Sequence, residues 1–475
     1  MHFITKTVVW FLSLFQTVSS FFGISPTQTL RVNPYETYQT IEGFGTSSAW
    51  WAQKIGDGAL ADQICKLLYD DQEGLGLEIF RYNVGGGEKE NPSSIIAMED
   101  RKTESFYRYN DVSGAWEFDF SRDENARRVL DAAVRYGAKR IVLFANSPHF
   151  SMTVNGKASG NETAGVCNLP QENYAKFVDY MLTVADHFVS LGYPIYAVSP
   201  INEPQWDWGT GWVSQEGCHY SPEEAVALLR LFAETMRQRN TPYTLCGPES
   251  GQMSEGFAEY ERLFCEDEVL SSYCAVYSGH SYWMDGDVAG KQAAHTRLQT
   301  AYGKPFGYEM SEWCELPQTL DPDTIESGLR MANVMMEDLT VMNAVSWQSW
   351  TAVNGDGLME LRDGAPHLFK RYYIMKQFSS FIPEGAVRIG IFDSALDQNR
   401  LKTAAFDCGD AVIFIVLNDT GEDIAVRFSG AYRSLTVART SAAENCETVY
   451  EGRPVRSQVF PSNSLTTLRF IKHGC

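Results

Sequence analysis

The feature that most constrains the fold of this 475-residue chain is a strand-then-helix alternation that repeats eight times. Each predicted strand is a short apolar, β-branched or aromatic run, followed by a polar or Gly/Pro cluster typical of a strand that ends in a loop. The predicted strands are residues 41–47, 77–84, 140–146, 196–202, 243–248, 274–280, 305–311 and 344–350.

The segments between these strands carry helix signals. In Ser221-Pro222-Glu223-Glu224, an N-cap serine is followed by a proline at the first helical position and by acids in the first turn. Eight strand–helix units predict a (β/α)₈ TIM barrel over residues 40–385. A doubly wound sheet is the alternative, but no dinucleotide or phosphate fingerprint favours it.

The sequence pattern changes at about residue 386, where short strand-like runs separated by Asn, Asp and Gly turns replace the strand–helix alternation. We therefore predict an appended all-β sandwich domain over residues 386–475, joined by the leading segment 28–39 with its strand at residues 29–32. The predicted fold class is α/β, a barrel with a β-sandwich.

The net charge limits which classes of partner the protein can bind. With 39 basic and 60 acidic residues the formal net charge is −21, which repels nucleic acid and anionic lipid but does not penalise a neutral polymer. Lys6 precedes an apolar run at residues 8–15, so we predict a signal peptide over residues 1–22 and a secreted protein. That run is too short for a stable membrane anchor. A buried or frayed N-terminal segment is the alternative, and we expect a monomer.

The cysteines and the common motifs exclude several chemistries. None of the ten cysteines form a C-x-x-C pair, so a structural zinc site has no support, while one or two disulfides are compatible with export. The chain has no G-x-S-x-G elbow and no H-E-x-x-H helix, which would mark an esterase or a metalloprotease. We expect no metal and no organic cofactor.

Two glutamates stand where a barrel carries its catalytic groups, at the carboxyl ends of its strands. Glu203 follows the fourth predicted strand and Glu312 follows the seventh. Hydrolysis of a glycosidic bond needs such a pair, one carboxyl to protonate the departing oxygen and one to attack or stabilise the oxocarbenium-like carbon.

With Asn202-Glu203-Pro204, with Glu312, and with Ile41-Glu42-Gly43-Phe44-Gly45 at strand one, the chain resembles glycoside hydrolase family 30 over nearly its whole mature length. The resemblance implies a retaining hydrolase with Glu203 as acid/base and Glu312 as nucleophile, and Asn202 hydrogen-bonded to the sugar 2-hydroxyl. It also places five further side chains near the substrate. For two of them, Arg81 and His280, the alternative to substrate binding is to orient a catalytic carboxylate by a hydrogen bond. These five are Arg81, Asn146, His280, Tyr282 and Trp347.

Neighbouring residues compete for these roles. Glu309 lies three residues before Glu312, and we interpret it as a barrel glutamate held by a cation. Trp206 and Trp51 follow strand ends and could stack on sugar rings or pack beneath their loops. We count both among the candidate substrate-binding residues.

Retention predicts double displacement with the two carboxyl groups about 5–5.5 Å apart. The strings 43–51 and 202–208 most resemble the endo-β-1,6-galactanase branch of the family, which acts on arabinogalactan side chains. Family relatives that act on β-1,6-glucan, glucuronoxylan or glucosylceramide could share every catalytic residue. A non-catalytic carbohydrate-binding protein is the alternative from another class.

Overall fold

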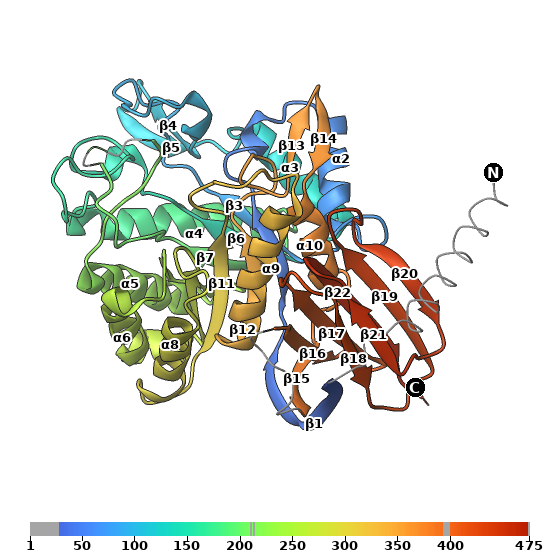
Figure 1. The fold of residues 1–475 in the computed structure, drawn as a ribbon. Helices are drawn as coiled ribbons and strands as arrows, with labels where there is room; N and C mark the ends of the chain where they lie inside the picture. The colour runs from blue at the N-terminus through green and yellow to red at the C-terminus, as the bar shows by residue number, and fades with distance from the viewer. Residues whose placement is uncertain (1–27, 210, 212–213, 393–399, 474–475) are drawn as a thin grey trace. The chain divides into compact units, whose positions relative to one another are not determined.

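The computed structural model describes residues 28–209, 211, 214–392 and 400–473. The chain divides into two compact units (Figure 1). The barrel unit contains Glu42–Thr319 and Asn333–Tyr372. The β unit contains the described parts of Met1–Ile41, Leu320–Ala332 and Tyr373–Cys475.

The barrel unit is built on one parallel sheet whose described strands pair in the order β8-β7-β6-β3-β2-β12-β11-β10-β9. β8 and β9 are two pieces of the fifth predicted strand; β8 pairs with β7 and β9 pairs with β10, which closes the ring. The predicted eight-stranded barrel with an appended β domain is confirmed. The strands are β2 (Gly43–Ser47), β3 (Ile79–Asn83), β6 (Arg140–Phe144), β7 (Ile195–Ser199), β8 (Thr244–Leu245), β9 (Pro248–Ser250), β10 (Val276–His280), β11 (Gly307–Trp313) and β12 (Ala344–Ser349).

Helices follow the barrel strands, and α5 shows why these segments are helical. The Ser221 hydroxyl accepts a hydrogen bond from the Glu224 N–H, and the Glu224 carboxylate accepts one from the Ser221 N–H, which forms a capping box followed by a proline. The helices are α2 (Gly58–Tyr69), α3 (Glu124–Tyr136), α4 (Tyr174–Ser190), α5 (Pro222–Arg239), α6 (Ala258–Glu266), α7 (Glu268–Tyr273), α8 (Val288–Thr300), α9 (Ile325–Thr340) and α10 (Lys370–Ser379), with short 3₁₀ turns η1 (Ala52–Lys54), η2 (Glu99–Arg101), η3 (Phe150–Met152), η4 (Gln171–Asn173) and η5 (Glu255–Phe257).

The seventh strand has the predicted length of seven residues but begins and ends two residues later than the sequence predicts. Its expected range, 305–311, stops before Glu312, whereas β11 runs from Gly307 to Trp313. The pairing of β11 shifts register toward β10 after Gly279 and toward β12 between Met310 and Trp313. Such an irregularity changes which side chains face inward, and here it turns Glu312 toward the barrel axis.

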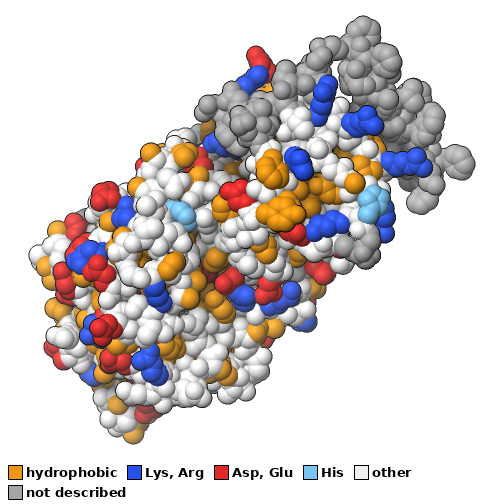
Figure 2. All heavy atoms as spheres, turned by 90° about the horizontal axis from the view of Figure 1, so that it is seen from below, with side chains coloured by type: hydrophobic (Ala, Val, Ile, Leu, Met, Phe, Trp, Pro, Cys, Tyr) orange, Lys and Arg blue, Asp and Glu red, His pale blue; other side chains and the backbone are white. Residues whose placement is uncertain are grey.

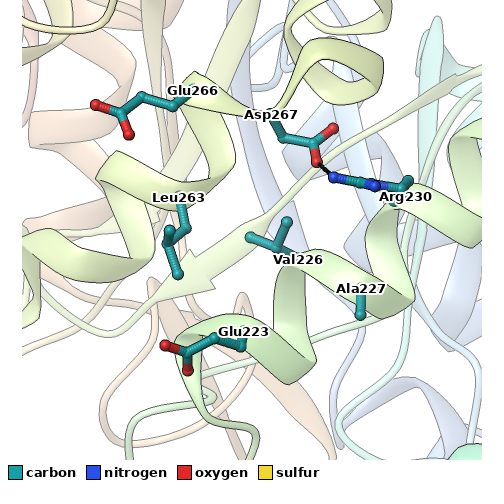
Figure 3. A pocket seen from close by; sticks show the side chains of 7 residues that line it. All are labelled: Glu223, Val226, Ala227, Arg230, Leu263, Glu266 and Asp267. Carbon is teal, nitrogen blue, oxygen red and sulfur yellow. Dashed lines mark hydrogen bonds and ion pairs between the residues drawn. The ribbon is translucent and has the colours of Figure 1, made fainter.

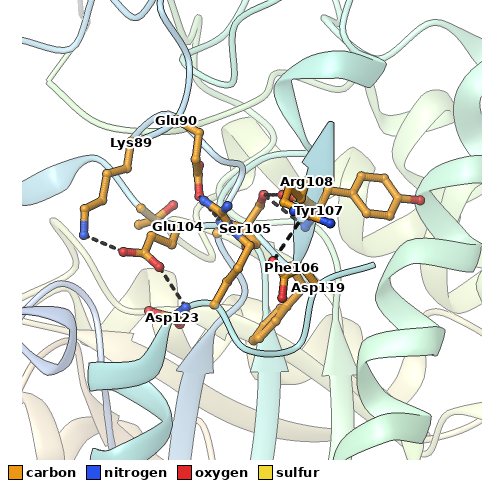
Figure 4. Close-up of polar contacts among 12 residues, drawn as sticks. Lys89, Glu90, Glu104, Ser105, Phe106, Tyr107, Arg108, Asp119 and Asp123 are labelled. Carbon is orange, nitrogen blue, oxygen red and sulfur yellow. Dashed lines mark hydrogen bonds and ion pairs between the residues drawn. The ribbon is translucent and has the colours of Figure 1, made fainter. Parts of the chain in front are cut away.

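The longest loop of the barrel follows β3 and carries two hairpin strands, β4 (Tyr107–Asn110) and β5 (Ala115–Phe118). Figure 4 shows how polar contacts hold its two ends together. The Lys89 ammonium lies 2.6 Å from the Glu104 carboxylate, which also accepts the backbone N–H of Asp123 at 2.8 Å, where α3 begins. The loop is therefore an ordered part of the barrel's carboxyl end. A second small hairpin joins β13 (Met359–Arg362) to β14 (Ala365–Leu368).

The β unit is a mixed sheet in the order β20-β19-β22-β17-β16-β15-β1-β18-β21 around one apolar core that includes Leu30, Phe414 and Leu468. β1 runs antiparallel to β15 and parallel to β18, and it extends well past the predicted 29–32 because it continues through register shifts after Asn33. The strands are β1 (Gln28–Thr40), β15 (Val387–Phe392), β16 (Lys402–Asp407), β17 (Ala411–Asn418), β18 (Ile424–Phe428), β19 (Ser434–Thr440), β20 (Glu447–Gly452), β21 (Ser457–Phe460) and β22 (Ser464–Ile471).

Two further expectations concern export. The predicted leader, residues 1–22, lies outside the described residues. Within the described part of the chain, no helix combines the length and apolar character that crossing a membrane requires. The nine described cysteines are all free thiols, so the disulfides that the sequence allows are not formed among them.

Candidate active site

Four charged side chains meet at the carboxyl ends of the barrel strands. Arg81 comes from β3, Glu203 from the loop after β7, His280 from the end of β10 and Glu312 from β11. All four are buried. Burying charges is expensive unless they compensate one another, so their gathering here marks a site rather than ordinary packing.

The two glutamates predicted from the sequence approach closely. One carboxylate oxygen of Glu203, one of Glu312 and a ring nitrogen of His280 all lie within 4.8 Å of one another. Inverting glycosidases separate their carboxyl groups by about 6.5–9.5 Å to admit a water between them. The spacing found here is that of a pair acting by direct attack.

The surroundings of the two glutamates differ. Glu312 Oε2 accepts a hydrogen bond from Arg81 at 2.8 Å, and Glu312 Oε1 accepts one from the Tyr282 hydroxyl at 3.0 Å. Burial raises the pKa of Glu312, while the positive charges of His280 and Arg81 oppose that rise. Glu203 has no such arginine partner among the described residues, and its nearest cation is His280, whose Nδ1 lies 3.4 Å away.

The backbone of Glu203 is fixed by its neighbours. Its φ of 46° lies in the left-handed region that non-glycine residues rarely adopt, and such residues gather at functional sites. The Glu203 N–H donates to the Glu249 carbonyl at 2.9 Å, and the Trp208 indole donates to the Glu203 carbonyl at 2.9 Å. These contacts hold a carboxylate-bearing residue in a conformation that its own side chain does not favour.

A third glutamate, Glu249 in β9, completes the charge network and was missed by the sequence analysis. Its carboxylate lies 3.3 Å from His280 Nε2 and 3.8 Å from the Arg81 guanidinium, and it accepts hydrogen bonds from Ser199, at 2.8 Å, and from Ser311. Burial favours the neutral form, but Arg81 and His280 outweigh it and hold the pKa of Glu249 at about 2. The available signal was a glutamate at the end of the fifth predicted strand.

His280 is therefore a cation among carboxylates. Burial alone would lower its pKa, but the charges of Glu312, Glu203 and Glu249 raise it to about 10. Glu203, His280 and Glu312 have metal-ligand spacing. A protonated imidazole has no lone pair to donate, however, and Arg81 adds a positive charge beside Glu312. The donor set therefore does not suit a metal ion.

The other predicted site residues fall into two groups. Asn202, which precedes Glu203, and Asn146, which follows β6, are both buried, and among the described residues their Oδ1 atoms have no hydrogen-bond partner. Trp51 is buried as well, but its indole N–H is satisfied by the Ser47 carbonyl at 2.8 Å. These are the contacts of a side chain that packs its own loop.

Trp347 does not face the barrel interior. Its indole N–H donates to Asp338 of α9 at 3.0 Å, while Ser346 and Gln348 on either side bond the interior Glu309. Because side chains alternate along a strand, the next position with the inward parity after Gln348 is Trp350, the residue directly after β12. Trp350 packs edge-on to Trp50, with centroids 5.3 Å apart. We therefore leave Trp347 out of the candidate site.

Glu309 also differs from expectation, because no cation pairs with it among the described residues. Its carboxyl is held instead by the Ser278 and Ser346 hydroxyls, each at 3.0 Å, and by the Gln348 amide at 3.1 Å. Burial and the nearby Glu249 raise the pKa of Glu309, and hydrogen bonds from neutral groups take the place of the expected salt bridge.

Figure 3 shows a different pocket, on the outer helices of the barrel. Its seven lining residues belong to α5 and α6 and to Asp267, and its one arginine, Arg230, is paired with Asp267. No pair of facing carboxylates like Glu203 and Glu312 occurs among the residues that line it. The carboxyl end of the barrel remains the candidate active site.

Comparisons with known proteins agree with this geometry. Residues 27–360 match the sequence model of O-glycosyl hydrolase family 30, which covers well over half of the chain. The protein belongs to that family, and it is a retaining glycoside hydrolase with a carbohydrate substrate.

Two relatives and one solved structure illustrate the similarity. The endo-β-1,6-galactanase of Hypocrea rufa is 25% identical over 441 residues, 87% of this chain and 85% of the relative. The exo-β-1,6-galactobiohydrolase of Bifidobacterium longum is 28% identical over 240 residues, 38% of this chain and 15% of the relative. A conserved exported protein from Bacteroides fragilis shares the fold with a TM-score of 0.84 at 21% identity, over 93% of this chain and 100% of that one.

Proposed function

We propose that this family 30 enzyme is an exported endo-β-1,6-galactanase that hydrolyses the β-1,6-galactan side chains of arabinogalactan by double displacement. The observation that carries the mechanism is the approach of Glu203 and Glu312 to within 4.8 Å, beside one arginine and one protonated histidine. The substrate is supported by the similarity to the Hypocrea rufa endo-β-1,6-galactanase along most of the chain.

In this proposal Glu312 is the nucleophile. Arg81 and Tyr282 hold its two oxygens, which stabilises the charged form of the carboxylate and fixes its direction of attack on the anomeric carbon. Glu203 protonates the departing sugar oxygen as the bond breaks, and then removes a proton from the water that releases the sugar from Glu312. Asn202 supplies a buried amide beside Glu203 that suits the 2-hydroxyl.

Two variants separate these roles. Glu312→Gln should lower kcat/KM on β-1,6-galactan by at least about a thousandfold, because no glycosyl-enzyme can form. Glu203→Gln should lower it about 10²- to 10⁴-fold on galactan but much less on β-galactosyl fluoride, whose leaving group needs no proton. The control is Glu309→Gln, a buried glutamate of the same strand that lies apart from the pair.

The stereochemistry and the substrate are tested separately. NMR of the first product should show the β-anomer, and an initial α-anomer would overturn double displacement. A panel of β-1,6-galactan, β-1,6-glucan, glucuronoxylan and an aryl glucoside decides between the proposed substrate and those of the family relatives. Binding of galactan without turnover by the wild-type protein would instead support a carbohydrate-binding protein.

Export has its own test. The protein recovered from the medium of the producing cells should begin near residue 23 if residues 1–22 are a cleaved signal peptide. Retention of the intact N-terminus on a cell-associated protein would contradict it.

A further inference from the structure

Three aromatic side chains from three different loops form one surface at the carboxyl end of the barrel. Trp206 follows β7, Phe257 lies in η5 after β9, and Trp283 follows β10. The Trp206 ring centroid lies 5.4 Å from that of Trp283 and 5.6 Å from that of Phe257, both edge-on. We refer to these three residues as the aromatic wall.

Trp283 is the exposed member of the wall. Its side chain is 51% exposed and its φ is 55°, a left-handed conformation that is unfavourable for a large residue. Its neighbour Tyr282 is buried and donates to Glu312. A tryptophan held in this way, half in solvent and next to a residue that touches the reaction centre, is better explained by ligand contact than by packing.

A glycine connects the wall to Glu203. A Cβ placed on Gly251 would lie 2.5 Å from Gln205 Nε2, 2.7 Å from Glu203 Oε1 and 3.1 Å from Trp206 Nε1. These three polar atoms therefore converge on the space that the absent side chain leaves. A substituent at Gly251 would obstruct the approach to the Glu203 carboxyl.

The amide of Gln205 is the second independent observation. Both its nitrogen and its oxygen are shielded from solvent, and neither has a hydrogen-bond partner among the described residues. An unpaired buried amide is unfavourable, and a hydroxyl group that both donates and accepts would satisfy it. A sugar combines such hydroxyls with an apolar C–H face that stacks on aromatic rings.

The position relative to the two glutamates decides which sugar binds there. Trp206 and the Gln205 amide adjoin Glu203, the proposed acid that protonates the departing oxygen, whereas Arg81 bonds Glu312. We propose that Trp206, Phe257, Trp283 and Gln205 form the subsite for the leaving-group sugar. This inference rests on the proposed function, and it specifies a glycan chain rather than a lipid or a small alcohol as the leaving group.

A pair of substrates tests the subsite. β-1,6-Galactotetraose places a sugar in the leaving-group subsite, and β-galactosyl fluoride places only fluoride there. Trp283→Ala should lower kcat/KM on the tetraose about tenfold or more while changing that on the fluoride less than about threefold. Trp283→Phe, which keeps a flat ring, should recover part of the loss.

The matched control is Tyr109→Ala, which removes an aromatic ring of 48% exposure from the β4–β5 hairpin and should leave both substrates unchanged. Gln205→Leu should reproduce the selective loss, because it removes the amide and keeps the bulk. Equal losses on both substrates would place Trp283 on the other side of the scissile bond, and no loss on either would remove it from the site. Both results overturn the inference.

Failure of the proposed substrate can be told apart from failure of the subsite. If the wild-type enzyme hydrolyses another glycan of the panel and not β-1,6-galactan, the proposed function is wrong. The same comparison then applies to an oligosaccharide of that glycan and its glycosyl fluoride. A selective loss in Trp283→Ala would still support the subsite.

Discussion

At the scale of single residues, the site is a balance of buried charges. Arg81 and His280 are positive, Glu249 and Glu312 are negative, and Glu203 must alternate between its two forms during turnover. No single pair of opposite charges would offset the cost of removing these groups from water, but together they compensate one another. Glu249 touches both cations, which makes it a positioning residue rather than a catalytic one.

The charge of His280 depends on Glu249, and Glu249→Gln tests this. With one of its three carboxylate neighbours neutralised, the imidazole should titrate below about 10, the value to which these neighbours now raise its pKa. NMR titration of the histidine-labelled enzyme measures the midpoint directly. Glu309→Gln is the control, because Glu309 is equally buried in the barrel but bonds only neutral groups. An unchanged midpoint in Glu249→Gln would show that Glu249 does not set the His280 charge.

The same two groups give stability contributions of opposite pH dependence. The pKa of Glu249, about 2, lies below the usual value of about 4.3, so its contribution is present above that value and is lost as the pH falls toward 2. The pKa of His280 is raised instead, so its contribution is complete below about pH 6.5 and is lost as the pH rises through about 10. Glu249→Gln should therefore lower the free energy of unfolding most between about pH 4.3 and about pH 6.5, where both contributions are complete.

At the scale of elements, the sequence was most informative where local chemistry decides the structure. The strand–helix alternation predicts the barrel, and the Ser221 cap predicts the start of α5. The expected ends of strands four and seven also bring Glu203 and Glu312 together. Such features depend on periodicity and capping, which the sequence alone contains.

What the sequence could not supply depends on register and on tertiary pairing. Trp347 was placed near the substrate by the family resemblance, and its outward direction could not be predicted because the parity of β12 is set by its pairing with β2 and β11, not by its composition. Glu249 was missed because the fifth strand breaks into β8 and β9, so its end was placed two residues too early, before Glu249. Trp283 gave no signal, since its neighbours in the aromatic wall come from distant loops.

The cap of α5 gives a prediction at this scale. Ser221→Ala removes the side-chain acceptor of the Glu224 N–H and should lower the free energy of unfolding of the barrel unit by about 1 kcal/mol. Ser221→Gly, the control, should lower it by only a few tenths of that amount, since glycine is tolerated at an N-cap. Tryptophan fluorescence during urea denaturation is the measurement, because every tryptophan after Trp10 lies in the residue range of the barrel unit. Equal effects of the two variants would contradict the capping role.

At the scale of the whole molecule, the net charge of −21 selects among polymers before any contact with the site. At the left of Figure 2 acidic and basic side chains are interspersed, so the excess of acid acts through the summed field of the molecule. Such a field leaves the encounter with a neutral galactan unaffected and opposes the approach of a polyanion. Salt screens it, with a Debye length of about 30 Å at 0.01 M and about 8 Å at 0.15 M.

The dependence of kcat/KM on salt concentration therefore distinguishes the effect of substrate charge from the effect of substrate shape at the site. Raising NaCl from about 0.01 M to about 0.15 M should change kcat/KM on neutral β-1,6-galactan less than about twofold, because neither partner's approach is steered by charge. On a galactan oxidised to carry carboxylates, the same increase should raise kcat/KM, because it screens the repulsion between two anions. A fall in activity with salt on the oxidised polymer would reveal local attraction by basic side chains near the site. In that case the arrangement of charges around the barrel end, rather than the total charge, would govern which glycans reach Glu203 and Glu312.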